Sequence, residues 1–234
     1  MKVIKKTLGA FTLIELLVVV AIIGILASAT MPALSKAIEI ANISKNSSNI
    51  RQILLACRTF AGDWEGMYPY FDPDADEEGG GEGSTFSTST EAFNVLIPDY
   101  LSAEGIFWIQ TKHPDKLRQP EEDGELKGSE NVYGYAVGQT NTGFSNSPLV
   151  FDGLMDGPGE YGEYHPWLAA KKAVIGYSGG HVIVERLTSG TAGATVQTKD
   201  RRIKNIFEER TVDENGKASG GWLETTQDKV LLPD

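Results

Sequence analysis

The chain has 234 residues, of which 21 are Lys or Arg and 32 are Asp or Glu, so its formal net charge is −11 at pH 7. This length suits a membrane helix and one globular domain better than two large domains, and the anionic balance argues against nucleic acid as a partner, because phosphate binding needs clustered cations. The one cysteine, Cys57, excludes an intrachain disulfide and is expected to be a small buried hydrophobic side chain on a helix face.

The first informative element is an uncharged run over residues 16–35, directly preceded by Glu15. As a helix, a run of this length extends about 30 Å, which is the thickness of one bilayer core. Glu15 costs a few kcal/mol in lipid, so we expect it to mark a functional pairing. Cations on the short leading side favour retention of that end in the cytoplasm, which places the rest of the chain across the membrane. These cations are Lys2, Lys5 and Lys6.

Residues 6–15 read Lys-Thr-Leu-Gly-Ala-Phe-Thr-Leu-Ile-Glu. This stretch resembles the class III leader of type IV prepilins and type II secretion pseudopilins. The resemblance implies that a prepilin peptidase cuts between Ala10 and Phe11 and that the new amino terminus is N-methylated. A cut after Gly9 would restore the glycine that the family nearly always has before the cut, but it would move Glu15 out of register, so we favour the Ala10 cut.

The resemblance also implies roles for three residues of the mature chain. The amine of Phe11 would neutralise Glu15 of a neighbouring subunit during assembly. Pro32 falls where the family usually places a proline, and it is expected to bend the helix because it lacks an N–H and crowds the preceding turn. The implied organisation is a leader over residues 1–10, a transmembrane and filament-core helix over 11–35, and a soluble pilin-like domain over 36–234.

The function that the resemblance implies is structural and not enzymatic: a subunit of a type IV pilus-like filament, most simply a pseudopilin for protein secretion. Its partners would be prepilin peptidase, other pilin or pseudopilin subunits and the inner-membrane assembly platform, with no cofactor and no nucleic acid. The protein would be a single-pass protein of the bacterial inner membrane, with its soluble domain in the periplasm or on the cell exterior. A surface type IV pilin for adhesion or motility is the alternative within the family.

Two other interpretations of the amino-terminal region stay open at this point. Residues 2–29 also fit an ordinary secretory signal that ends in Ala27-Ser28-Ala29, which would release a secreted binding or hydrolytic domain. A plain uncleaved membrane anchor is the other. The mature amino terminus separates the three cases, since it would be methylated Phe11, Thr30 or Met1.

Apolar residues continue at helical spacing beyond Pro32, so we expect one long kinked helix over residues 11–61. The remainder predicts an α+β fold in which this helix lies on a small antiparallel sheet. The predicted elements are short helices over 91–101, capped by Ser89 or Thr90, and over 199–210, strands over 106–109, 132–137 and 148–151, a hairpin of 173–177 with 181–187, and a last strand or tail over 222–232.

Several patterns in the chain resemble sites of chemistry but match them only in part. Asp72, Asp74 and Asp76 have the one-three-five spacing of a calcium loop, but Glu77 replaces the required glycine, so a solvated acidic loop is the simpler interpretation and calcium is the alternative. The glycines at 157, 159 and 162 match a dinucleotide fingerprint, yet prolines around them prevent the helix start that it requires. Ser145, Asp152 and His165 form a triad only on paper, without a nucleophile elbow, and His113 and His181 lack metal-ligand spacing.

Overall fold

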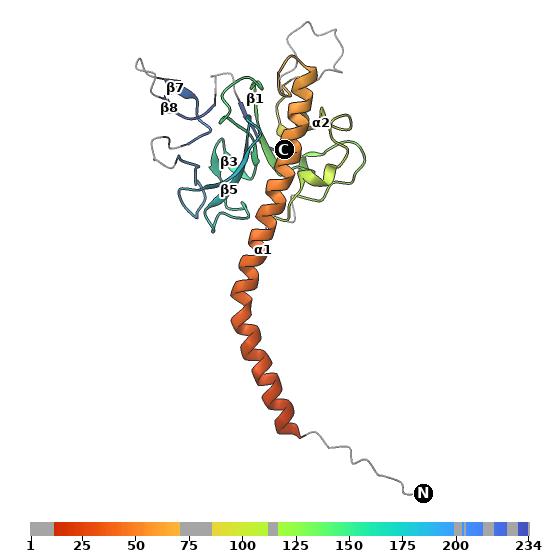
Figure 1. The fold of residues 1–234 in the computed structure, drawn as a ribbon, viewed down its shortest axis with the longest axis vertical. Coiled ribbons are helices and arrows are strands. Elements are labelled where there is room, and N and C mark those ends of the chain that lie inside the picture. Colours follow the sequence, from red (N-terminus) through yellow and green to blue (C-terminus); the bar gives the residue numbers. More distant parts are fainter. Residues whose placement is uncertain are drawn as a thin grey trace. The chain divides into compact units, whose positions relative to one another are not determined.

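The structure is a computed structural model that divides into two units, residues 1–42 and 43–234, which are described separately (Figure 1). The residues that it describes are 12–70, 86–111, 117–198, 203, 205–212, 218–223 and 229–233.

The predicted long helix is confirmed as α1, Leu13–Asp63, which has 51 residues. The helix continues through Pro32 without a break, whereas the bend expected at this proline stays a prediction. In the first unit, almost every described side chain of α1 is exposed. In the second unit, α1 has a buried face with helical spacing, as expected for a helix that covers a sheet. Its buried residues are Ile43, Asn46, Asn49, Ile50, Ile53, Leu54, Ala56, Cys57, Phe60 and Ala61.

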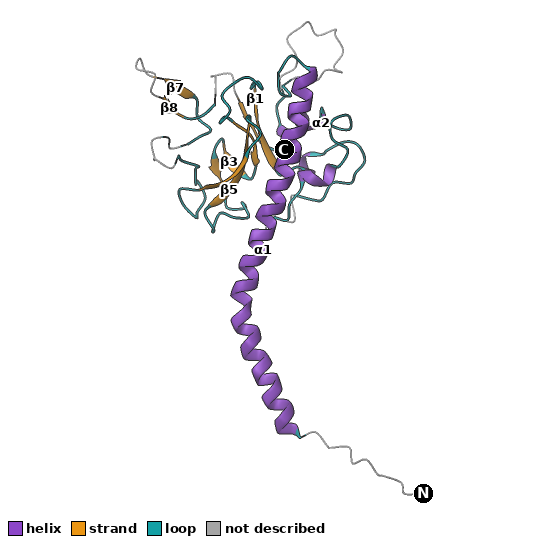
Figure 2. Ribbon diagram, viewed as in Figure 1, coloured by secondary structure: helices purple, strands orange, loops and turns teal. Residues whose placement is uncertain are grey.

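The main sheet has five antiparallel strands in the order β6-β5-β2-β1-β9, and Figure 2 shows its strands beside the second-unit part of α1. The strands are β1 (Tyr133–Val137), β2 (Pro148–Asp152), β5 (Lys172–Tyr177), β6 (Val182–Arg186) and β9 (Lys229–Leu231). Two small hairpins accompany it: β3 (Met155–Gly157) with β4 (Glu160–Tyr161), and β7 (Arg210–Val212) with β8 (Ala218–Gly220). The predicted α+β class and the hairpin of β5 and β6 are confirmed.

Both faces of the sheet are covered by apolar side chains. Successive side chains of a strand point to opposite faces, and on β5 Val174 joins a core with α1 while Ala173 and Ile175 join a second core with the carboxy-terminal segments. The close approach of α1 depends on Gly176, because a Cβ there would lie 2.6 Å from Ile50 Cγ2.

Two predicted elements around the sheet are wrong in type or length. Residues 106–109 were predicted as a strand, but Glu104–Phe107 forms a 3-10 helix that buries Ile106 and Phe107. A short apolar run does not by itself separate a strand from a helical turn. The helix predicted over 91–101 is α2, Ser89–Asn94, and its cap is Thr88, which forms a capping box with Glu91. Ser89 is not the cap because its hydroxyl donates a 2.7 Å hydrogen bond to the Tyr133 carbonyl.

The terminal helix predicted over 199–210 is also wrong in its described part. Residues 205–208 form a turn region and residue 210 begins β7. Ile203, Ile206 and Phe207 are buried in the second core, so burial and not helix formation accounts for their apolar character.

Candidate assembly site

The first turn of α1 is fixed by a capping box between Thr12 and Glu15. Thr12 precedes the helix, and its N–H and its hydroxyl both donate to Glu15 Oε2 at 2.9 Å. In return, the Glu15 N–H donates to Thr12 Oγ1 at 3.3 Å. A threonine followed three positions later by a glutamate is the sequence pattern of this motif. Glu15 was predicted only to pair with a neighbouring chain, and its capping role was not predicted although Thr12 and Glu15 have the pattern.

This geometry leaves one oxygen of the carboxylate available. All the hydrogen bonds that Glu15 accepts within the described part of the chain go to Oε2. Oε1 can therefore accept from a donor outside the chain, such as an amine, without loss of the cap. The processing residues Gly9, Ala10 and Phe11 lie outside the described residues, so the cleavage position stays a prediction.

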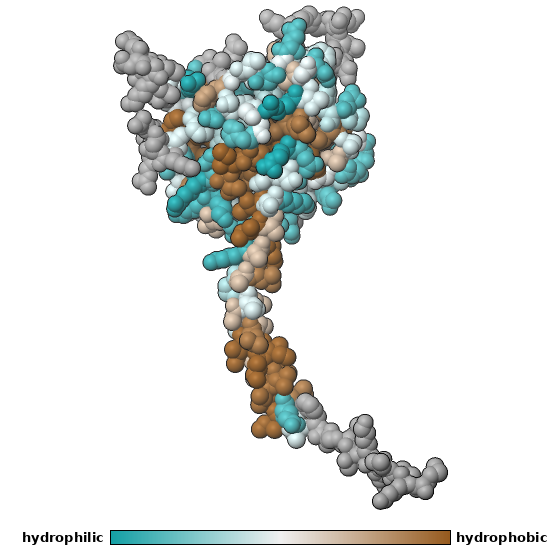
Figure 3. Space-filling model, in the orientation of Figure 1, coloured by the Kyte–Doolittle hydropathy of each residue, from teal (hydrophilic) through white to brown (hydrophobic). Residues whose placement is uncertain are grey.

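The described start of α1 presents an apolar surface on all sides. The exposed fraction of its large apolar side chains ranges from 47% at Val18 and Val19 to 89% at Leu13. Figure 3 shows this surface in brown along the amino-terminal part of the helix. By length and composition α1 is able to cross a membrane, a property that signal sequences share. An apolar surface of this extent indicates contact with lipid or with other chains.

The few hydroxyl groups along this surface are satisfied within the helix. Ser28 donates to the Ile25 carbonyl at 2.9 Å, Thr30 to Ala27 at 3.0 Å and Ser35 to Met31 at 3.1 Å. Because lipid offers no hydrogen-bond partners, groups that bond to the preceding turn can enter a bilayer or a helix bundle at low cost. Pro32 lies within this stretch of α1.

In the second unit, a buried polar network joins α1 to the sheet. Asn46 donates to Asp152 at 2.5 Å and accepts a 2.7 Å hydrogen bond from the Tyr133 hydroxyl. Asn49 donates to the same hydroxyl at 3.3 Å, and the Val174 N–H donates to the second oxygen of Asp152 at 2.7 Å. Each bond has a required direction, so the network specifies which turn of the helix faces which strand.

Two ionisable groups of this region are buried together. Burial raises the pKa of the Asp152 carboxyl to about 7, against the opposing effect of the donors Val174 and Asn46. Burial lowers the pKa of His165 to about 4. His165 Nε2 lies 3.9 Å from Asp152 Oδ2 and only 2.8 Å from the Lys172 carbonyl, so the ring donates to the backbone.

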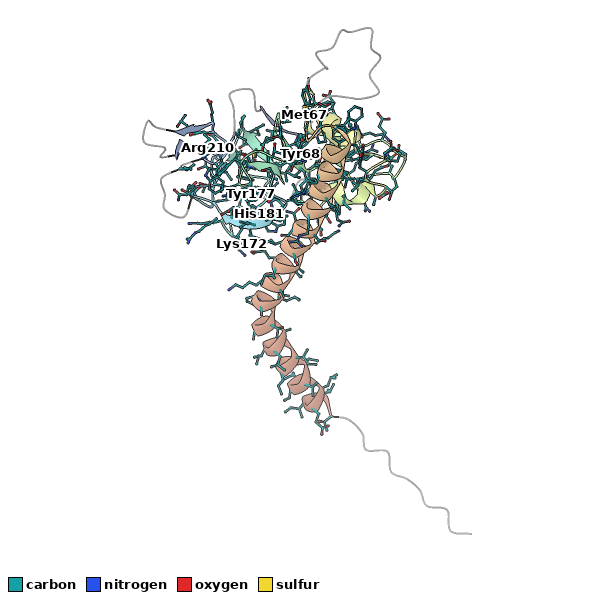
Figure 4. All side chains as sticks on the ribbon, turned by 45° about the horizontal axis from the view of Figure 1, so that its top comes forward. Met67, Tyr68, Lys172, Tyr177, His181 and Arg210 are labelled. Atoms are coloured by element: carbon teal, nitrogen blue, oxygen red, sulfur yellow. The ribbon has the colours of Figure 1, made fainter. Side chains whose placement is uncertain are left out.

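Ser145 and His165 do not form a working catalytic site. Ser145 is exposed, and its carbonyl accepts a 2.9 Å hydrogen bond from Gly179. His165 is buried with its Nε2 engaged by Lys172, so it cannot activate an exposed serine. Figure 4 shows His181 beside Tyr177 at the β5–β6 hairpin. The two rings are stacked, with a distance of 4.8 Å between their centroids.

Asp72, Asp74, Asp76 and His113 lie outside the described residues. Within the described ranges, no three metal-ligating side chains come together. Cys57 is buried, as predicted, and burial raises its pKa, which opposes formation of a thiolate. The glycines at 157, 159 and 162 belong to the β3–β4 hairpin and its end, not to the start of a helix.

Comparison with known proteins adds one match. The family model described as the prokaryotic N-terminal methylation motif matches residues 9–31, which include both the proposed cut and Glu15. Neither curated proteins nor solved structures gave a match to the chain. The chain therefore carries the prepilin-type N-terminal methylation signature that type IV pilins and pseudopilins share.

Proposed function

We propose that the chain is a structural subunit of a type IV pilus-like filament and, more specifically, a pseudopilin of a type II secretion system. Prepilin peptidase would cut it between Ala10 and Phe11, and the Phe11 amine would then be methylated. The soluble domain would lie in the periplasm. The amino-terminal part of α1 would lie in the inner membrane until the assembly platform incorporates the subunit into a filament.

The observation that carries this proposal is the capping box at the start of an exposed apolar helix. Glu15 has one oxygen committed to Thr12 and one that is unengaged within the described chain. A carboxylate in lipid needs a partner, and the cationic amine of a neighbouring mature terminus is of the right charge. Pairing of this kind would set the axial register while apolar helices replace lipid around one another.

The test is filament incorporation of Glu15→Leu in cells that also express prepilin peptidase and an assembly platform. We expect normal membrane insertion, normal cleavage and loss of assembled filaments. Glu39→Leu is the matched control, since Glu39 is the other acidic residue before residue 63 of α1. Normal filament incorporation of Glu15→Leu would contradict the proposal.

Mass spectrometry of the mature terminus is the second readout. Methylated Phe11 supports the proposal, whereas a terminus at Thr30 or Met1 contradicts it. The location of the filaments separates the two finer assignments, because a surface pilin would be sheared from the exterior of cells that lack an outer-membrane secretion channel.

A further inference from the structure

Charge is unevenly divided between α1 and the rest of the second unit. Residues 43–62 contain three cations and no acidic residue, whereas residues 63–234 contain 14 cations and 30 acidic residues. The helix is thus the positive element of a strongly negative domain. Its cations are Lys45, Arg51 and Arg58.

Two of these cations flank an exposed leucine on the outer face of the helix. Arg51, Leu55 and Arg58 are spaced four and three residues apart, which places them on one face, and all three are exposed. The side chain of Leu55 is 66% exposed. Neither arginine forms an ion pair with any described carboxylate. We call these three residues the arginine stripe.

The opposite chemistry occurs at the β3–β4 hairpin. Asp156, Glu160 and Glu163 are exposed and have no ion pair within the described part of the chain, and Tyr164 beside them is 40% exposed. A Cβ at Gly162 would clash with the Asp156 carboxylate, so Asp156 lies directly over the strand end. The hydrogen bond and charge of Glu163, with the charge of Asp156, raise the pKa of the Tyr164 hydroxyl. We call Asp156, Glu160, Glu163 and Tyr164 the acidic hairpin.

We propose that the arginine stripe of one copy of the chain docks on the acidic hairpin of a second copy. Each surface has what the other lacks: two guanidinium groups beside an exposed leucine on one, and three exposed carboxylates, two of which act on Tyr164, on the other. Guanidinium groups bind carboxylates through paired hydrogen bonds, and apolar contact between Leu55 and Tyr164 would exclude water from the centre.

The contact joins two different surfaces, so it is heterologous and can repeat from copy to copy. Contacts of this kind generate rings or open helical filaments. The inference therefore rests on the proposed filament function and names the polar contact that would act outside the membrane. A membrane surface or a nucleic acid fits less well as the partner, because both would be repelled by the acidic remainder of the domain.

The first experiment reverses charge on each side in the full chain. We expect Arg51→Glu with Arg58→Glu, and separately Glu160→Lys with Glu163→Lys, to lower the amount of assembled filament by about fivefold or more. Combining the four changes should restore it to within about twofold of the native chain. Arg51→Glu alone is included because Arg58 also lies against the turn at Gly180.

Matched controls carry the same charge change elsewhere. Lys45→Glu lies on α1 away from the stripe, and Glu125→Lys is an exposed carboxylate outside the hairpin; neither should lower filament yield by more than about twofold. Failure of the combined variant to recover would overturn the contact, because the stripe would then have a different partner. Equal losses in the control variants would also overturn it, since net charge alone would explain the effect.

The second experiment detects the contact directly. Under oxidising conditions, cells that produce Leu55→Cys and Tyr164→Cys as separate chains should form a disulfide-linked dimer. Neither variant should form it alone, because its introduced cysteine would face a native residue across the contact and Cys57 is buried. Leu55→Cys with Glu125→Cys is the control pair and should not couple. Absence of the first dimer, or equal coupling of the control, would overturn the contact. If the native chain forms no filaments, the proposed function fails, and the same cross-link in detergent-solubilised full chain still decides whether the two surfaces meet.

Discussion

The side-chain amide of Asn46 donates a 2.5 Å hydrogen bond to the carboxylate of Asp152, which lies 106 residues later in the chain. Both side chains are buried. The bond connects α1 to the last residue of β2, so it holds the helix to the sheet at one particular turn. A displacement of α1 by one turn would leave a buried carboxylate without this donor, which is costly.

Asn46→Leu should therefore destabilise the domain strongly. The change removes one of the two donors to Asp152 and leaves the Tyr133 hydroxyl without its acceptor. We expect the free energy of unfolding to fall by about 2–4 kcal/mol. Urea titration of the full chain in detergent measures it, with Ser48→Leu on the exposed face of α1 as the control. A loss below about 0.5 kcal/mol would show that the network does not stabilise the fold.

The buried pair predicts a cancellation in the pH dependence of stability. The pKa of Asp152 is raised to about 7, so its stabilising contribution is present below its unfolded pKa, near 4, and is lost as pH rises through 7. The pKa of His165 is lowered to about 4, so its contribution is present above its unfolded pKa, near 6.5, and is lost as pH falls through 4. The two slopes oppose each other between about pH 4 and 6.5.

Single substitutions should expose each slope. Relative to the native chain, Asp152→Asn should gain stability as pH rises from 4 to 6.5, because only the His165 term remains, and His165→Gln should lose stability over the same range. Urea titrations at several pH values measure the difference from the native chain. Parallel curves for all three proteins would contradict the assignment of these pKa shifts.

Gly176→Ala should separate α1 from the sheet. The added Cβ would lie 2.6 Å from Ile50 Cγ2 and 2.7 Å from Leu54 Cδ1, and both side chains are buried. We expect a loss of about 1–3 kcal/mol, since a packed core cannot yield without strain. Gly157→Ala is the matched strand control, because its Cβ would meet nothing within 4 Å. Equal effects of the two changes on the melting temperature would rule out close helix contact as the cause.

The sequence predicted the elements whose signals are local. The three-and-four spacing of apolar residues indicated α1, and the hairpin of β5 and β6 followed from two apolar runs around Ser178, Gly179 and Gly180. The turn region around Ile206 has the same helical spacing as a real helix, and only its burial in the second core explains it. Periodicity records which side chains are apolar, not which element buries them.

The features of the candidate site also differ in whether a local sequence pattern reveals them. The match over residues 9–31 and the cap of Glu15 are encoded by adjacent residues, so a sequence pattern can reveal them. The spacing of the arginine stripe places its residues on one helix face, which the sequence shows, but only the structure shows that this face is exposed. The Asn46–Asp152 bond joins residues that are 106 positions apart, and no local pattern encodes such a contact.

Thr12→Ala tests whether the capping box helps Glu15 to act in assembly. The change removes the hydroxyl that donates to Glu15 Oε2 and accepts from its N–H, so the first turn should lose about 1 kcal/mol and the carboxylate should lose its fixed position. We expect a filament yield several-fold below native but above that of Glu15→Leu, while Thr12→Ser, which keeps the hydroxyl, should assemble normally. Thr30→Ala is the control, because its hydroxyl bonds only to the Ala27 carbonyl along the same helix. If Thr12→Ala assembles as well as Thr30→Ala, the cap holds the helix end alone and Glu15 is positioned by its neighbouring subunit.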